Sequence, residues 1–173
     1  MSIKQWLYLV RTDLYRYTGD IKFKSFINSY LFVPGFRFSF WLRLCKYLQR
    51  AHYPRPVYLA ARLILHHYSI KYGFDIAVTA EIGEGFYLGH FGGVAISPRA
   101  IIGKNCNISQ GVTLGQKNRG KHAGYPVIKD NVYIGPGAVI IGNVVVGNFA
   151  AIGGNCVVTK DVPDYAVVVG VPG

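Results

Sequence analysis

Aliphatic residues recur at every sixth position through the second half of the chain. The clearest run covers residues 128–158: Ile128, Ile134, Ile140, Val146, Ile152 and Val158. Two earlier runs, over 76–94 and 96–114, keep this spacing but are offset by two residues, which predicts a small insertion around 89–95. A period of six matches neither an α-helix, with its period of about 3.6, nor an alternating strand, with its period of two.

A six-residue period is typical of a parallel β-helix, in which short strands and turns wind into stacked coils. Three repeats complete a triangular coil of about 18 residues, and such a solenoid buries its core only where coils stack. We therefore predict about five coils over residues 73–173. Cys106 and Cys156 fall at small interior positions of this pattern, so we expect them to pack rather than react.

Residues 131–159 contain no charged side chain, and a stretch of this length could cross a membrane as a helix. However, it holds six Gly, four Asn and Pro136, and its apolar residues recur every six positions. This pattern favours continued β-helix over a membrane span.

Residues 1–72 have a different composition. They hold 12 Lys+Arg and 2 Asp+Glu, a net charge of +10 within the total of +11, and 17 aromatic residues but only 2 of the 21 Gly. We predict an α-helical segment over 1–72 and a separate β-helical domain over 73–173. Helices are expected over residues 34–50 and from Pro56 to about Ser69.

The predicted helix over 34–50 has one apolar face and one cationic face. The apolar face holds Phe36, Phe40, Leu44, Tyr47 and Leu48, and the cationic face holds Arg43, Lys46 and Arg50. A basic amphipathic helix rich in aromatic residues can lie in an anionic membrane interface. Alternatively, it forms a cap that packs on the β-helix. Both interpretations stay open. No disulfide framework and no signal peptide are expected, so we predict a cytoplasmic protein. The membrane interpretation would place it peripherally at the inner face of the cell membrane.

Residues 89–96, Gly-His-Phe-Gly-Gly-Val-Ala-Ile, and 108–115, Ile-Ser-Gln-Gly-Val-Thr-Leu-Gly, resemble the hexapeptide-repeat acyltransferases. The resemblance covers residues 73–173 and is strongest to the serine acetyltransferase branch and its relatives that O-acetylate bacterial polysaccharides. The basic N-terminal segment looks more like those polysaccharide-modifying relatives. The resemblance implies a left-handed parallel β-helix, a homotrimer and acetyl-CoA as the acetyl donor.

His90 is the candidate general base. It lies at the insertion that breaks the six-residue phase, between Gly89 and Gly92, and imidazole titrates near neutral pH. An exposed corner histidine is the alternative, but His90 matches the family motif. Asp75 resembles the family's carboxylate partner of this histidine. Since it precedes His90 by 15 residues, close to one coil, we expect both side chains on one edge.

The acceptor site departs from the serine enzymes, as this resemblance describes them. Gly89 stands where an Asp normally precedes the catalytic histidine, and Ala-Gly-Tyr-Pro at 123–126 replaces an Asp-Arg-His-Pro motif. Groups that would pair with a zwitterionic amino acid are missing, which disfavours free serine. We therefore interpret the chain as an O-acetyltransferase of a sugar hydroxyl in a surface polysaccharide or its lipid-linked precursor. Serine O-acetylation for cysteine biosynthesis is the alternative.

The loop over 116–127 interrupts the repeat, and long insertions in solenoids usually mark the functional face. We expect His122 or Tyr125 to face the acceptor of a neighbouring subunit, although a solvated basic loop is the alternative. Phe91 and Tyr125 could stack on sugar rings. By their positions in the family, Pro136 and Gly154 should line the pantetheine groove.

Two other classes of function are disfavoured. A nucleic-acid-binding module would use the basic aromatic segment, but the sequence has no recognition motif for one. A β-helical carbonic anhydrase needs three histidine ligands for zinc, and the repeat region has only His90 and His122. We therefore expect no metal.

Overall fold

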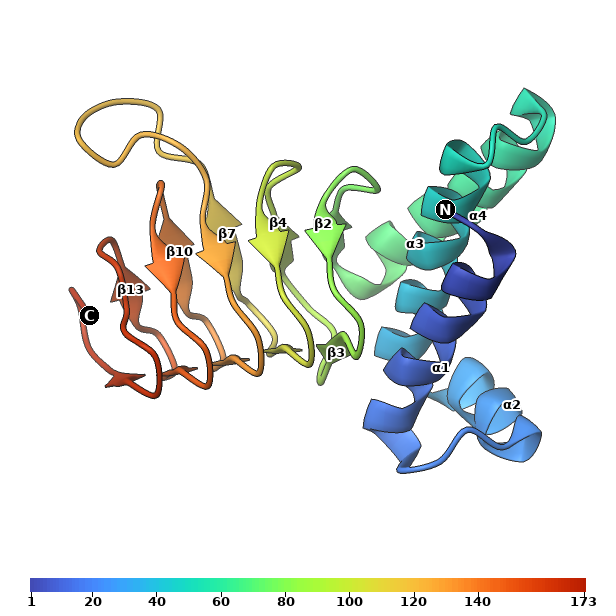
Figure 1. The fold of residues 1–173 in the computed structure, drawn as a ribbon, viewed down its shortest axis with the longest axis horizontal. Helices are drawn as coiled ribbons and strands as arrows, with labels where there is room; N and C mark the ends of the chain where they lie inside the picture. The colour runs from blue at the N-terminus through green and yellow to red at the C-terminus, as the bar shows by residue number, and fades with distance from the viewer.

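A computed structural model describes all 173 residues, as four helices followed by fourteen short strands (Figure 1). The helices are α1 (Ile3–Thr18), α2 (Phe23–Phe32), α3 (Pro34–Arg50) and α4 (Arg55–Tyr72). The strands are β1 (Phe74–Ile76), β2 (Glu81–Ile82), β3 (Tyr87–Leu88), β4 (Val94–Ile96), β5 (Ile101–Ile102), β6 (Asn107–Ile108), β7 (Thr113–Gly115), β8 (Val127–Ile128), β9 (Tyr133–Ile134), β10 (Val139–Ile141), β11 (Val145–Val146), β12 (Ala151–Ile152), β13 (Val157–Val158) and β14 (Val167–Val168).

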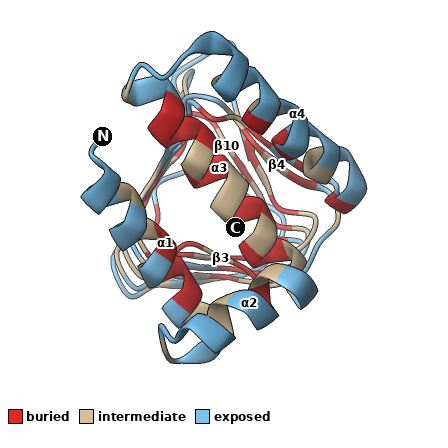
Figure 2. Ribbon diagram, turned by 90° about the vertical axis from the view of Figure 1, so that its right-hand side faces the viewer, coloured by how far each residue is buried: buried red, intermediate tan, exposed pale blue.

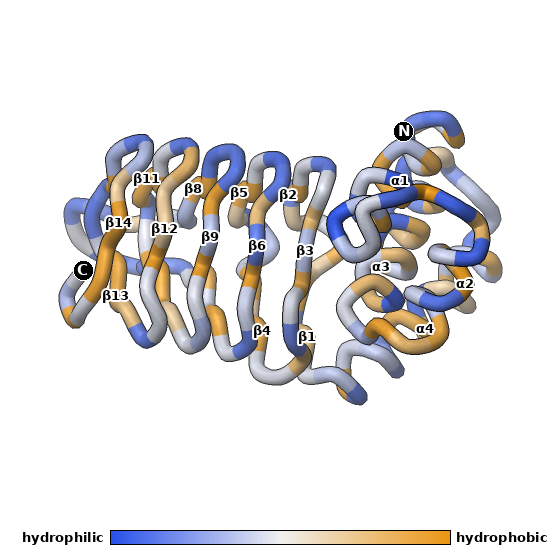
Figure 3. Tube along the Cα trace, turned by 90° about the horizontal axis from the view of Figure 1, so that it is seen from below, coloured by the Kyte–Doolittle hydropathy of each residue, from blue (hydrophilic) through white to orange (hydrophobic).

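The strands form three parallel sheets that make the walls of a triangular prism. The first sheet has the order β1-β4-β7-β10-β13, the second β11-β8-β5-β2, and the third β14-β12-β9-β6-β3. Figure 3 shows the strands of the third sheet side by side along the prism. Five strands in the first sheet correspond to five coils, as the repeat predicts. The fold is the expected left-handed β-helix of hexapeptide repeats.

The register explains the three aliphatic runs. Ile76 pairs with Ile96, Ile96 with Leu114, and Leu114 with Ile140, and all four side chains are buried inside the prism. The step from 76 to 96 is two residues longer than the step from 96 to 114. The predicted insertion is therefore confirmed. The step from 114 to 140 is longer again, because it includes the loop after β7.

Close stacking of the coils requires small residues at the corners. At Gly103, an added Cβ would lie 2.7 Å from the carbonyl carbon of Lys129 in the next coil, far inside van der Waals contact. Corner residues Asn105, Asn131 and Asn155 adopt the left-handed conformation, which Asn tolerates better than most residues. Residues 131–159 form strands β9 to β13, which confirms the prediction of continued β-helix over this uncharged stretch.

The four helices cover the N-terminal end of the prism (Figure 2). Their centre is α3, which contacts α1, α2 and α4 as well as β3. Its predicted apolar face is buried or half-buried, with Phe36 and Leu48 buried, whereas Arg50 of the predicted cationic face is exposed. Helices α3 and α4 confirm the two helices expected from the sequence. None of the four helices is long and apolar enough to cross a membrane.

The expectation of a basic, membrane-facing stripe on α3 is wrong. Arg43 is buried, and its Nε lies 3.0 Å from Oδ2 of the buried Asp13, while its Nη1 donates to the Ile82 carbonyl at 2.7 Å. Lys46 is also buried and donates to the Ala80 carbonyl at 2.6 Å. These cations face the first coil because its backbone carbonyls need donors there. The alternative, a cap on the β-helix, is confirmed.

Candidate active site

One edge of the prism, between the third and first sheets, carries most of the candidate chemistry. Backbone hydrogen bonds stack its corners coil on coil: Gly111 N donates to Gly92 O at 2.8 Å, and Gly137 N to Gln110 O at 2.9 Å. In the next step, Asn155 N donates to Pro136 O at 2.8 Å. The insertion holding His90 therefore lies on the same edge as Pro136 and Gly154. We call this the catalytic edge, defined by residues 89–93, 109–111, 135–137 and 153–155.

His90 lines a cleft of about 240 Å³ beside this edge. The structure brings His90 and Pro136 together in it, as the family positions imply. Apart from His90, the lining side chains are aromatic, aliphatic or neutral polar: Tyr87, Asn107, Ile108, Ser109, Gln110, Tyr133 and Pro136, with Gly89. Gly154 stacks on Pro136, since an added Cβ would lie 3.3 Å from the Pro136 carbonyl oxygen. An exposed imidazole beside a neutral cleft can remove a proton from a bound hydroxyl.

Gln110 is a cleft residue that sequence reasoning did not single out. Its side-chain Oε1 is buried and accepts no hydrogen bond. A buried polar atom without a partner is unusual in a folded protein. The only signal in the sequence was its place in the string 108–115, between the interior positions Ile108 and Val112.

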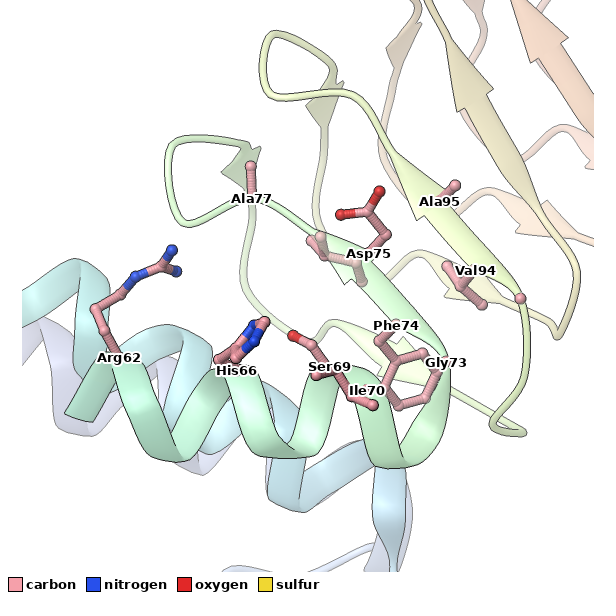
Figure 4. Close-up of a pocket in the computed structure, with 12 residues that line it drawn as sticks. Arg62, His66, Ser69, Ile70, Gly73, Phe74, Asp75, Ala77, Val94 and Ala95 are labelled. Atoms are coloured by element: carbon pink, nitrogen blue, oxygen red, sulfur yellow. The ribbon is translucent and has the colours of Figure 1, made fainter. Parts of the chain in front are cut away.

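Asp75 lies elsewhere. It lines the largest cavity, about 590 Å³, between α4 and the first sheet, with Arg62, His66 and Ser69 on the helix (Figure 4). Figure 4 shows the Asp75 carboxylate turned away from α4. The expectation that Asp75 and His90 share one edge is not met. Because the inserted residues lengthen the first coil, Asp75 is in register with Ala95, and no hydrogen bond joins it to His90.

The loop after β7 does not meet His90 within one chain. It follows the strands of the first sheet, whereas His90 precedes them, so the two lie at opposite ends of parallel strands. The loop is held by Lys117 and Gly124, which exchange backbone hydrogen bonds of 3.0 and 2.9 Å. The backbone carbonyl of His122 accepts a hydrogen bond from Asn143 N. The guanidinium carbon of Arg99 lies over the Tyr125 ring, 5.5 Å from the ring centre. A contact with His90 therefore requires a second copy.

Phe91 also points away from the cleft. Its side chain is 62% exposed, and its ring centre lies 6.4 Å from that of Tyr72 at the end of α4. The structure therefore gives no support to Phe91 as a stacking partner beside His90. Stacking of Phe91 on a sugar ring remains a prediction.

Helix α1 closes the N-terminal end of the cleft. Arg16 contacts the Asn107 side chain, and the Tyr17 hydroxyl accepts from Leu88 N at 3.0 Å. Burial raises the pKa of Tyr17 well above its usual range, so it stays a neutral positioning group. Burial also raises the pKa of both Cys45 and Cys106 to about 11. Neither thiol is therefore a thiolate nucleophile at neutral pH, in agreement with the packing role expected for Cys106.

Comparison with known proteins points in one direction. Residues 125–160 match the family model described as bacterial transferase hexapeptide (six repeats). The serine acetyltransferase of Bacillus subtilis is 40% identical over 126 residues, which are 73% of this chain and 58% of that protein. The enzyme of Synechococcus elongatus is 36% identical over 140 residues, 81% of this chain and 56% of that protein. This chain thus spans little more than half the length of these relatives.

Solved structures agree. The Neisseria gonorrhoeae serine acetyltransferase in complex with serine has a TM-score of 0.80 at 33% identity, covering 98% of this chain and 68% of that one. The soybean serine acetyltransferase apoenzyme has a TM-score of 0.81 at 32% identity, with the same two coverages. A serine acetyltransferase in complex with CoA has a TM-score of 0.79 at 29% identity, covering 98% and 69%. The likeness therefore includes the four helices as well as the β-helix.

Proposed function

This chain belongs to the serine acetyltransferase family of hexapeptide-repeat transferases, and from that premise we propose that it transfers an acetyl group from acetyl-CoA to a hydroxyl. The observation that carries the proposal is the placement of His90 in a cleft on the catalytic edge, one side of which is formed by Pro136. A base must stand beside the bound thioester, and this edge places an exposed histidine next to a cleft.

The proposed reaction needs no covalent intermediate on the enzyme. His90 removes the proton of the acceptor hydroxyl as its oxygen attacks the thioester carbon. A carbon–oxygen bond forms, the carbon–sulfur bond breaks, and the proton passes from the imidazolium to the departing CoA sulfur. Backbone N–H groups are the proposed donors to the oxyanion. Pro136 and Gly154 are the proposed contacts for the pantetheine arm.

Serine is the acceptor that the comparisons favour. The relatives are named serine acetyltransferases, and one solved relative holds serine. The polysaccharide acceptor expected from the sequence finds no support among them. A neutral sugar hydroxyl stays as a second candidate on one observation: apart from His90, the cleft has no charged lining side chain. The cation at its border, Arg16, contacts Asn107, and no carboxylate lines the cleft to pair with an amino acid's ammonium group.

We also propose that the working site lies between copies of the chain, as in the homotrimer that the resemblance implies. Two observations support this. The loop carrying His122 and Tyr125 lies at the opposite end of the first sheet from His90, and Asp75 has no hydrogen bond to His90 within the chain. Asp75 therefore stays a predicted partner of His90, to be supplied by a neighbouring copy or by movement of the loop 89–93.

The deciding experiment is to measure release of free CoA from acetyl-CoA with L-serine, with a panel of sugars and with membrane lipid extract in parallel. Turnover with serine establishes the serine enzyme. Turnover with sugars or extract alone establishes the second candidate. If purified protein neither binds CoA by calorimetry nor releases it with any acceptor, the proposed function is wrong.

A further inference from the structure

Helix α2 carries an apolar stripe that no other part of the chain covers. Phe23, Ile27 and Leu31 are four residues apart, which places them on one side of the helix, and they are 79%, 40% and 53% exposed. Phe32, at the end of the helix, is 74% exposed, and Ile21 just before it is 54% exposed. Water-exposed apolar side chains gathered in this way usually mark a binding surface. We call these five residues the α2 patch.

The α2 patch lies in strongly cationic surroundings. Lys22 and Lys24 are exposed beside it, and α2 itself contains no acidic residue. Residues 1–72 have 12 cations, of which Arg43 and Lys46 are buried, so 10 remain. Of the two acidic residues, Asp13 is buried and only Asp20 remains. Asp20 lies directly before Ile21 and accepts from Lys22 N at 3.0 Å, and Glu81 pairs with Arg50 at 2.6 Å. The outside of the helical region therefore keeps a large net positive charge.

These charges distinguish an anionic lipid surface from a self-complementary contact with a second copy. A second copy docked on the same patch about a two-fold axis would bring Lys22 and Lys24 against their own counterparts, and like charges repel. An anionic lipid surface instead accepts the apolar side chains among its acyl chains and pairs the lysines with its headgroup phosphates. Only the lipid surface is complementary to both features.

We propose that the α2 patch docks this protein on an anionic lipid surface, with Phe23, Ile27 and Leu31 inserted and with Lys22 and Lys24 at the headgroups. The location differs from the one that the sequence suggested, since the cations of α3 face inward. The proposal does not depend on acetyl transfer. Its geometric consequence does rest on the proposed function: α1, which leads into α2, borders the His90 cleft, so docking holds that cleft near the lipid surface.

The test is co-flotation of the full chain with vesicles. Binding is expected to vesicles of phosphatidylcholine with phosphatidylglycerol at low salt, to weaken at high salt, and to be absent with phosphatidylcholine alone. The double substitution Phe23→Ser and Phe32→Ser should weaken binding at least about tenfold, because two large apolar side chains no longer leave water. Charge reversal at Lys22 and Lys24 to Glu should abolish it.

The matched control is Phe149→Ser, which removes a phenylalanine that is 51% exposed on the β-helix, far from α2. It should bind vesicles as the unsubstituted chain does. Thermal melts establish that the variants fold, and CoA binding in solution tests the proposed function separately. Equal binding to neutral vesicles, or binding unchanged by the α2 substitutions, overturns the proposal. A drop in mass by light scattering on Phe23→Ser, without loss of lipid binding, would assign the patch to a second copy instead.

Discussion

The two regions of this molecule bury polar groups in opposite ways. Inside the β-helix the buried side chains are aliphatic, aromatic or cysteine, whereas all five buried polar or charged residues belong to the helices: Asp13, Ser29, Ser39, Arg43 and Lys46. The β-helix satisfies its backbone by repetition, since each coil pairs with the next. The helical region has no repeat and must satisfy polar groups one at a time.

The meeting point of the two regions explains this difference. The first coil has no preceding coil, so its outward backbone groups need other partners. Asp13 accepts from Phe86 N at 2.8 Å, Arg43 and Lys46 donate to carbonyls of residues 80–83, and Tyr17 bonds both backbone groups of Leu88. The buried polar side chains of the helices therefore make the hydrogen bonds to the first coil that a preceding coil would otherwise make. The comparison teaches that a solenoid needs a different kind of chemistry at its end than along its length.

The largest expected effect comes from removing one of these charges. Asp13→Ala leaves Arg43 buried without its carboxylate and Phe86 N without an acceptor. We expect a loss of about 3–5 kcal/mol in the free energy of unfolding, the usual result of breaking a buried ion pair. Urea denaturation measures it. A loss below about 1 kcal/mol for Asp13→Ala would show that the end of the β-helix needs no charged cap.

The next effect separates chemistry from stability. His90→Ala should lower kcat at least about 100-fold, the lower range for loss of a general base, while leaving the melting temperature unchanged, because His90 is exposed. His67→Ala, an exposed histidine on α4, is the matched control and should keep full activity. Near-normal turnover by His90→Ala would show that His90 is not the general base.

A smaller effect tests the stacking of coils. Gly103→Ala places a methyl group against the Lys129 backbone and should cost about 1–3 kcal/mol in the free energy of unfolding. Gly115→Ala is the matched control, since its nearest contact would be an ordinary 3.4 Å to Ile141 Cγ1. If the two variants melt alike, coil spacing is more adaptable than the backbone geometry indicates.

The smallest expected effect is on how the free energy of unfolding changes with pH. Burial raises the pKa of Asp13, although Arg43 and backbone N–H groups oppose the shift. Between the unfolded pKa and the raised folded pKa, the folded chain holds a proton that the unfolded chain has lost. Stability from this group is therefore greatest below the unfolded value and falls as pH rises. Asp13→Asn should remove this slope in denaturation curves from acidic to neutral pH. A contribution that instead rises with pH would mean that Arg43 outweighs burial.

Sequence alone determined the β-helix, the position of its two insertions and the placement of His90 outside the regular wall. It could do so because a six-residue period indicates which side chains point inward, and because an offset in that period indicates inserted residues at that point. Helices over 34–50 and after residue 55 followed from equally local signals. Helices α1 and α2 were not delimited, since their apolar residues are mixed with charges and aromatic residues on several faces.

Only the tertiary structure decided which cations are buried and which groups meet. Arg43 looks like a surface residue until Asp13, 30 positions earlier, is placed beside it. The distance between Asp75 and His90 along the chain suggested a shared edge, but the lengthened first coil changed the register and placed Ala95 there. The physical reason is the same in both cases: a repeat encodes contacts between like positions of neighbouring coils, whereas contacts at an insertion or an end depend on residues that no period connects.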